Sequence, residues 1–238
     1  MNLNSKIAIV TGASSGIGAE FSKDLVKKGT TVYGLARSFD KLKEIQNEIG
    51  NQFIPVKMDI TDATSLEEWV TKTFNDELSP DILINNAGIG YFAQIQDLTI
   101  DEWNTMLNVN LSGVFLLTRL IVPMMKENEQ ICHIVNISSI AGIMGNPELS
   151  GYNASKYGLR GFSDALFKEL RYDGIKVSCF FPGSIATDFF DSQDTIKQHP
   201  NMMSASDVSS TLMHVLETPD NFLINEIIMR PLNPKKPD

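Results

Sequence analysis

A tyrosine and a lysine stand four positions apart in the segment Tyr152-Asn153-Ala154-Ser155-Lys156. In a helix, residues at positions i and i+4 share one face, so the Lys156 ammonium can reach the Tyr152 side chain. A free phenol has a pKa of about 10 and is a poor base at neutral pH. A neighbouring ammonium favours the phenolate and lowers that pKa, which suits the pair to acid–base chemistry. The spacing alone is a weak signal, because it also arises by chance.

A glycine-rich segment, Thr11–Gly18, follows the first apolar run of the chain and reads TGASSGIG. Glycines let the backbone turn sharply and approach a diphosphate closely. The N-terminus of the helix that follows offers free N–H groups and the positive end of a dipole. The segment therefore predicts a dinucleotide-binding loop, and the alternative is a tight turn that holds no ligand.

The residues after the second apolar run bear on the ribose preference of such a site. A site for NAD places a carboxylate at this strand end to bind both ribose hydroxyls, and Ala36 offers none. Asp40 lies too far into the next helix to replace it. The Arg37 guanidinium suits a bidentate contact to a 2′-phosphate, and Ser14 and Ser38 could add hydroxyl donors. The pattern favours NADP(H), with a solvated surface role for Arg37 as the alternative.

Short apolar runs that predict strands alternate with longer stretches that predict helices. The strand centres are continuously apolar, as in a parallel sheet covered on both faces. The pattern predicts a doubly wound α/β (Rossmann) fold of about seven parallel strands. The predicted strands are Lys6–Val10, Thr31–Leu35, Phe53–Lys57, Asp81–Ile84, Ile131–Ile137, Lys176–Phe181 and Leu223–Met229. The predicted helices are Ser15–Lys28, Phe39–Ile49, Asp62–Phe74, Asp101–Met125, Tyr152–Tyr172 and Ser206–Glu217.

A single domain is predicted over 1–238, because no repeat, linker or low-complexity segment interrupts this alternation. Two stretches differ in composition from the rest. The polar stretch 187–204 is too long for a tight connection and is interpreted as a substrate flap. The tail 231–238 contains three prolines and is expected to be extended or frayed.

The chain carries 20 Lys and Arg against 29 Asp and Glu, a formal charge of −9. Nucleic-acid-binding proteins and proteins of anionic membranes normally present a basic face, so both partners are disfavoured. Cys132 and Cys179 have apolar neighbours and are interpreted as buried thiols of a reducing compartment. The apolar stretch 109–125 contains polar residues and Pro123, so it is not expected to span a membrane. A strand that starts at Lys6 leaves no room for a signal peptide, and a cytoplasmic protein is expected.

Further motifs occur in a recognisable order: TGASSGIG at Thr11–Gly18, NNAG at Asn85–Gly88, Asn110, Ser139, YNASK at Tyr152–Lys156 and PGSIAT at Pro182–Thr187. With this set the chain resembles the short-chain dehydrogenase/reductase family. It is similar to the compact one-domain branch rather than the extended epimerase branch. The resemblance covers nearly the whole chain, from Lys6 to about Arg230, and the motifs are jointly highly specific.

The resemblance implies catalytic roles for Asn110, Ser139, Tyr152 and Lys156. Tyr152 would exchange a proton with the substrate oxygen, and Ser139, thirteen residues before it as in the family, would hydrogen-bond that oxygen. Lys156 would bind the nicotinamide ribose and lower the pKa of Tyr152. Asn110 would bend its helix and help to hold a water that links Lys156 to solvent. Only one of Ser138 and Ser139 can face the cofactor, because successive strand side chains point to opposite faces, and the family spacing selects Ser139.

The resemblance also implies contacts with the cofactor. Asp59 matches the position that contacts the adenine amino group, with a simple loop cap as the alternative. Asn86 would sit by the adenosine ribose, while Thr187 and the Ile185 N–H would fix the nicotinamide carboxamide. The full expected set is Gly12, Ser14, Ser15, Gly16, Ile17, Gly18, Arg37, Asp59, Ile60, Asn86, Ala87, Gly88, Asn110, Tyr152, Lys156, Pro182, Gly183, Ile185 and Thr187. No metal site is expected.

The substrate pocket is expected to be mixed in character, with no arginine placed to clamp a carboxylate. Its candidate residues are Ile89, Gly90, Tyr91, Asn146, Ser184, Phe189 and Phe190. Phe189 and Phe190 either cap the substrate or pack the flap. The helix after Tyr152 carries an apolar stripe, which either forms the four-helix subunit interface that the resemblance implies, in a homo-oligomer (dimer or homotetramer), or is buried in the core. The stripe consists of Leu159, Phe162, Ala165, Leu166 and Leu170.

The combined expectation is an NADP(H)-dependent oxidoreductase that interconverts a secondary alcohol and a carbonyl in a small-molecule substrate by hydride transfer. Two alternatives remain. One is a non-catalytic NADP(H)-binding redox sensor, which the complete catalytic set argues against, and the other is the same chemistry with NAD(H). The chain, including Asn225-Glu226-Ile227, looks similar to the bacterial 3-hydroxy acid and serine dehydrogenases of the family. That similarity is weak guidance, because a fold does not fix a substrate.

Overall fold

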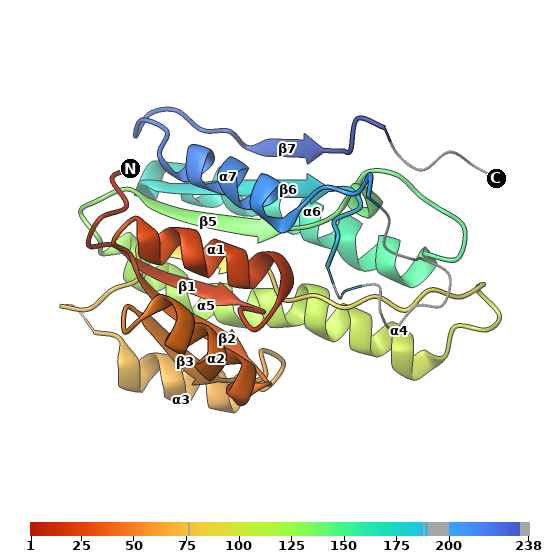
Figure 1. Ribbon diagram of the computed structural model, residues 1–238, viewed down its shortest axis with the longest axis horizontal. Helices are drawn as coiled ribbons and strands as arrows, with labels where there is room; N and C mark the ends of the chain where they lie inside the picture. The colour runs from red at the N-terminus through yellow and green to blue at the C-terminus, as the bar shows by residue number, and fades with distance from the viewer. Residues whose placement is uncertain (76, 188, 190–199, 234–238) are drawn as a thin grey trace.

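Seven parallel strands form a sheet in the order β3-β2-β1-β4-β5-β6-β7 in the computed structural model, which describes residues 1–75, 77–187, 189 and 200–233 (Figure 1). The predicted doubly wound sheet is therefore confirmed. The strands are β1 (Ile7–Thr11), β2 (Thr31–Ala36), β3 (Phe53–Lys57), β4 (Ile82–Asn85), β5 (Cys132–Ile137), β6 (Ile175–Pro182) and β7 (Glu226–Met229). The helices are α1 (Gly16–Lys27), α2 (Phe39–Ile49), α3 (Ala63–Thr73), α4 (Ile100–Leu107), α5 (Gly113–Lys126), α6 (Ser150–Leu170) and α7 (Ala205–Leu216).

Helices cover both faces of the sheet, and alternate strand residues supply two separate cores. Val10 points to the face where α1, α2 and α7 pack, and Ile9 points to the face of α3, α5 and α6. On the first face α1 and α7 lie side by side (Figure 1). Fully buried strand residues such as these explain why the strands read as continuous apolar runs.

Two predicted elements differ from the structure. The predicted helix Asp101–Met125 is divided into α4, a π-helical turn at Asn108–Ser112 and α5. The predicted last strand Leu223–Met229 is shortened to β7, because the Val177 carbonyl, which would continue the ladder, accepts the side-chain amide of Asn225 at 3.2 Å. These differences are local and leave the sheet order unchanged.

The strand order changes direction between β1 and β4, so the loops after these strands run to opposite sides of the sheet. Such a switch point leaves a crevice at the carboxyl ends of the strands, where ligands of doubly wound folds bind. The predicted flap 187–204 is described only at 187, 189 and 200–204, and the predicted tail 231–238 only at 231–233. The rest of both segments lies outside the described residues.

The stretch Ile100–Lys126 is the one part of the described chain that is long and apolar enough to cross a membrane. Within it, Met106, Leu117 and Ile121 are fully buried in the fold. Leu117 and Ile121 of α5 pack into the core on the sheet face that α3, α5 and α6 cover, so α5 is a core helix. The prediction that 109–125 is not a membrane span agrees with this packing.

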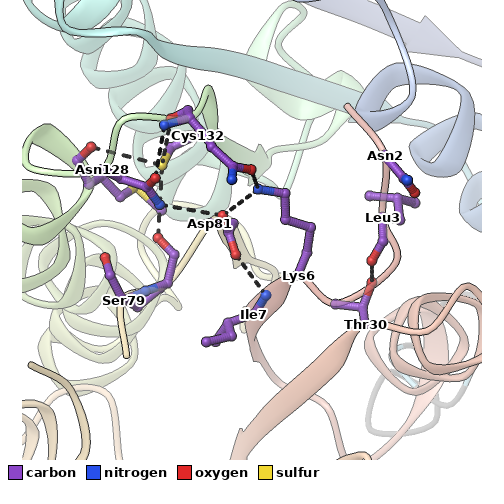
Figure 2. Close-up of polar contacts among 12 residues, drawn as sticks. Asn2, Leu3, Lys6, Ile7, Thr30, Ser79, Asp81, Asn128 and Cys132 are labelled. Carbon is purple, nitrogen blue, oxygen red and sulfur yellow. Dashed lines mark hydrogen bonds and ion pairs between the residues drawn. The ribbon is translucent and has the colours of Figure 1, made fainter. Parts of the chain in front are cut away.

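A buried ion pair between Lys6 and Asp81 joins the amino ends of the central strands β1 and β4 (Figure 2). The crevice lies at the other, carboxyl, ends of these strands. Lys6 Nζ lies 2.7 Å from Asp81 Oδ1, and the Ile7 N–H donates to Asp81 Oδ2 at 2.9 Å. Lys6 also donates to the Gln130 side chain, and Asn128 donates to Asp81 Oδ1 at 3.4 Å. These contacts satisfy both charges and link the first strand to the loop before β5.

Candidate active site

A cleft of about 750 Å³ opens at the carboxyl ends of the strands. Residues after β1, β2, β3, β4, β5 and β6 contribute to its walls. All the residues expected to bind cofactor or to act in catalysis line this cleft, with two exceptions. Gly18 and Asn110 do not line it but contact residues that do. The structure therefore brings the sequence-predicted set together in one place.

The loop after β1 has the backbone that its glycines predict. Gly12 and Gly16 adopt positive φ angles of 66° and 55°, which side-chain-bearing residues rarely adopt. A Cβ atom at Gly18 would lie 2.3 Å from the Gly12 carbonyl oxygen, so only glycine fits this packing. Ser15 at the N-terminus of α1 makes no side-chain cap bond, so the first backbone N–H groups of the helix can bind a ligand. The loop thus fits the diphosphate of a dinucleotide.

Asn86, expected beside the adenosine ribose, binds the glycine loop itself. Its side-chain Nδ2 donates to the Thr11 carbonyl at 2.9 Å and the Gly12 carbonyl at 3.3 Å. In return the Thr11 hydroxyl oxygen accepts the backbone N–H groups of Asn86 at 2.9 Å and Ala87 at 3.0 Å. This reciprocal pairing fixes the first two cleft loops against each other, and sequence patterns did not reveal it.

The cleft extends past the ends of β2 and β3 to Arg37, Ser38 and Asp59. Arg37 is exposed, and among the described residues it makes no ion pair. Asp59 Oδ1 accepts the Thr61 N–H at 2.9 Å and the Thr61 hydroxyl at 2.7 Å. Asp59 therefore caps its own loop, the alternative considered from the sequence, while it also lines the cleft.

Tyr152 and Lys156 are both buried at the inner end of the cleft, with 8% and 3% of their surface exposed. Burial raises the pKa of Tyr152 to about 12, against the opposing effect of a hydrogen bond with Ser139. Burial also lowers the pKa of Lys156 to about 8. In the protein alone, desolvation of the phenolate is the largest effect on this pKa, and the lowering expected from Lys156 together with an oxidised nicotinamide stays a prediction.

The two adjacent serines point in different directions. Ser138 is 3% exposed and its hydroxyl donates to the Lys156 carbonyl of α6 at 3.1 Å. Ser139 Oγ accepts the Ala141 N–H at 3.2 Å, and Ser139 lowers the pKa of Tyr152, against the larger effect of burial. Ser139 is therefore the serine that lies beside the phenol.

Asn110 lies in the π-helical turn between α4 and α5 and is fully buried. Its Oδ1 accepts the Ile89 N–H at 2.8 Å, and its Nδ2 donates to the Ile89 carbonyl at 2.8 Å and to Ser155 Oγ at 3.0 Å. A Cβ atom at Gly88 would lie 3.3 Å from Lys156 Nζ and 3.4 Å from Asn110 Oδ1. Asn110 thus ties the loop after β4 to α6 directly behind Lys156.

The segment after β6 closes the other side of the cleft. The Ala186 N–H donates to the Met203 carbonyl at 2.9 Å, and the Met203 N–H donates to the Ser184 carbonyl at 3.1 Å. The space above Gly16 is bounded by Thr187, whose side chain would lie 3.5 Å from a Cβ atom there. Thr187 therefore stands opposite the glycine loop, and Ile185 lines the same cleft, where the carboxamide contacts are expected.

Phe92 is a cleft residue that the sequence reasoning missed. Its ring lies edge-on to the Tyr152 ring, with centroids 5.8 Å apart, and the Phe189 ring lies 6.0 Å from the same ring. Leu149 and Ala141 also line this end. The signal for Phe92 was its position directly after the candidates Gly90 and Tyr91; Phe190 lies outside the described residues.

The short chain dehydrogenase family model matches residues 6–198 of this chain. The chain belongs to this family. It is 38% identical over 190 residues to the 3-oxoacyl-[acyl-carrier-protein] reductase of Vibrio harveyi, covering 79% of this chain and 77% of that one. It is 32% identical over 236 residues to an uncharacterized oxidoreductase of Staphylococcus saprophyticus, covering 98% and 100%.

Solved structures of short-chain dehydrogenases share the whole fold. A serine dehydrogenase complexed with NADP⁺ has a TM-score of 0.88 at 26% identity, covering 97% of this chain and 96% of that one. A 3-ketoacyl-(acyl-carrier-protein) reductase from Brucella melitensis complexed with NADH has a TM-score of 0.85 at 27% identity, covering 97% and 98%. Members of this group thus bind nicotinamide dinucleotides of both kinds.

Proposed function

We propose that this short-chain dehydrogenase is an NADP(H)-dependent oxidoreductase that interconverts a secondary alcohol and a carbonyl. The observation that carries the proposal is the meeting of Ser139, Tyr152 and Lys156 in one cleft with a glycine loop that fits a diphosphate. A bound nicotinamide would supply or accept the hydride. The protein's own residues would bind the cofactor, orient the substrate and exchange a proton with the substrate oxygen.

Three side chains carry the proton chemistry in this proposal. Ser139 holds the substrate oxygen beside the Tyr152 hydroxyl, because both side chains line the same end of the cleft. A phenol with a pKa of about 12 is protonated at neutral pH, so Tyr152 is ready to donate a proton to a carbonyl oxygen. For alcohol oxidation the phenol must first lose its proton, and the positive charges of Lys156 and an oxidised nicotinamide favour that loss.

The preference for NADP(H) is supported by Arg37, which lines the cleft after β2. No carboxylate stands at the strand end, where Ala36 is found. A planar guanidinium can bind a 2′-phosphate through two hydrogen bonds. The same chemistry with NAD(H) remains the alternative, and the NADH complex of a related reductase keeps it open.

A spectrophotometric screen tests the proposal. The protein is mixed with NADPH and a panel of ketones, aldehydes and diketones, or with NADP⁺ and β-hydroxy acids, and the absorbance of the reduced nicotinamide is followed. Carbonyl-dependent oxidation of NADPH supports the enzyme. Tight NADPH binding without any substrate-dependent turnover would instead support the redox-sensor alternative.

We further propose that the protein forms a cytoplasmic homotetramer. Most of the expected apolar stripe on α6 is not available for contact, because Leu159, Leu166 and Leu170 are buried in the core. The proposal is supported instead by Phe115 of α5 and Tyr157 of α6, which are 47% and 43% exposed. Sedimentation of the wild type and of the Phe115→Glu variant tests it, since loss of the apolar contact should yield smaller species.

A further inference from the structure

Aromatic rings meet at the inner end of the cleft, around the Tyr152 phenol. The Phe92 ring and the Phe189 ring lie 5.8 Å and 6.0 Å from the Tyr152 ring. A Cβ atom at Gly90 would come within 2.8 Å of the Phe92 ring and 3.3 Å of the Phe189 ring. Both rings therefore bound the same space. We call Phe92 and Phe189 the aromatic wall.

The surroundings of the aromatic wall are apolar. Tyr152, Ala141 and Met106 form a buried cluster of their own, apart from the two cores of the sheet. Partly buried Ile89 and Leu98 pack against it. The Tyr152 hydroxyl and Ser139 thus form a small polar site within an apolar setting, which fits one carbonyl oxygen.

Charge in the cleft is concentrated away from this wall. Of the described residues that line the cleft, the charged ones are Arg37, Asp59 and Lys156. Arg37 and Asp59 follow β2 and β3, which β1 and β4 separate from β5 in the sheet. Lys156 Nζ donates to the Ile137 carbonyl at 3.0 Å and lies against Gly88. Its ammonium lies 5.7 Å from the centre of the Tyr152 ring and is the cation of the described cleft residues that stands nearest the reacting hydroxyl.

We propose that the substrate is an uncharged ketone, or the matching alcohol, whose larger substituent is an apolar ring packed against Phe92 and Phe189. The two phenylalanines are then specificity-determining residues. The inference rests on the proposed carbonyl reduction, in which hydride adds to the carbonyl carbon and the Tyr152 proton adds to its oxygen. A ring beside Phe92 gains edge-to-face contact, whereas a carboxylate there loses its water against two apolar rings.

A matched pair of substrates tests the role of charge. Ethyl acetoacetate and acetoacetate share the same ketone, and only the second carries a carboxylate. With NADPH and the wild-type enzyme, kcat/KM for the ester should exceed that for the acid by about 100-fold, because the carboxylate must lose its water against apolar rings. An equal or higher kcat/KM for acetoacetate would overturn the proposal.

Two conservative variants test the aromatic wall. Phe92→Leu and Phe189→Leu keep an apolar side chain but remove the ring, so the ratio of kcat/KM for acetophenone to kcat/KM for 2-butanone should fall by about tenfold. The control is Phe222→Leu, which changes an exposed phenylalanine before β7. NADPH affinity, measured by fluorescence titration, should be the same in all variants. An unchanged preference for acetophenone in both wall variants would contradict the proposal.

A binding measurement separates this inference from the proposed function. Acetophenone cannot react with the protein loaded with NADP⁺, so titration calorimetry gives its dissociation constant without turnover. That constant should rise by about tenfold in Phe92→Leu. If no carbonyl is reduced in any screen but acetophenone binds in this manner, the proposed reaction fails and the inference stands. If carbonyls are reduced but acetophenone does not bind, the inference fails alone.

Discussion

Lys156 donates a hydrogen bond from Nζ to the carbonyl oxygen of Ile137, 3.0 Å away at the end of β5. This contact pins the first turns of α6 to the carboxyl end of the central sheet. It holds the ammonium 5.7 Å from the centre of the Tyr152 ring. A buried ammonium loses much of its hydration, which explains why the pKa of Lys156 falls to about 8.

The pH dependence of carbonyl reduction should follow the protonation of the Lys156 side chain. Lys156 is protonated below its pKa of about 8 and becomes neutral as the pH rises through that value. Tyr152, with a pKa of about 12, keeps its proton throughout this range. We expect kcat for reduction to fall above about pH 8, as the positive charge beside the reacting oxygen is lost. In Lys156→Arg the falling limb should move to higher pH, and an unchanged profile would contradict this account.

Removal of the phenol hydroxyl should abolish turnover without affecting cofactor binding. Tyr152→Phe retains the ring and its contacts with Phe92 and Phe189 but has no proton to donate. We expect kcat to fall by about 10³-fold, the scale of general acid catalysis, with NADPH affinity unchanged. Stopped-flow measurement of kcat and fluorescence titration of NADPH check both parts. Near-wild-type turnover in this variant would exclude Tyr152 as the acid.

Arg37 should set the preference between cofactors. In Arg37→Ala we expect kcat/KM with NADPH to fall by about 10- to 100-fold, the worth of a charge-assisted bidentate contact, while kcat/KM with NADH hardly changes. Lys43→Ala is the control, because it removes one positive charge from exposed α2 without touching the cleft. If the ratio of the two kcat/KM values stays the same in Arg37→Ala, Arg37 does not read the 2′-phosphate.

The fold and most cleft residues could be predicted because they depend on local pattern and chain order. Apolar strands buried on both faces leave a clear signal, and residues that follow parallel strands meet at one sheet edge. Gly12 and Gly18 are predictable because backbone geometry allows no other residue. These features require no knowledge of side-chain packing.

The features that the sequence did not predict depend on tertiary packing. Phe92 reaches Tyr152 only because the loop after β4 folds over Met106, whose sulfur accepts the Tyr91 N–H at 3.4 Å. The direction of the Tyr152 pKa shift follows from its burial, which residue spacing does not contain. Asn86 binds Thr11 through a contact between two loops far apart in sequence.

The ion pair between Lys6 and Asp81 should stabilise the fold without contributing to activity. Both side chains are about nine-tenths buried, so removing one leaves the other charged and unpaired. We expect Lys6→Met to lower the free energy of unfolding by about 3–5 kcal/mol, with kcat/KM unchanged at low temperature. The double variant with Asp81→Asn should recover part of the loss, because no buried charge remains. Urea unfolding of the four proteins in this cycle provides the test.

His133 should make the fold sensitive to acid. Ser178 Oγ donates to the Ile224 carbonyl at 2.6 Å, so it must accept the His133 Nε2–H at 2.9 Å. His133 Nδ1 is then an unprotonated nitrogen, buried without a hydrogen-bond partner among the described residues. Burial lowers the pKa of His133 to about 3, because a proton on Nδ1 would place an unsolvated charge in the core.

The pKa of His133 is about 3 in the folded protein and about 6.5 in the unfolded chain, and this difference makes the free energy of unfolding depend on pH. Above about pH 6.5 it is neutral in both states, and below that value only the unfolded chain takes up the proton. The free energy of unfolding should therefore fall by about 1.4 kcal/mol per pH unit from pH 6 towards pH 3. His133→Gln, whose amide can still donate to Ser178, should flatten this slope, whereas His214→Gln on the exposed face of α7 should not. Equal slopes in the wild type and His133→Gln would show that the acid sensitivity arises elsewhere.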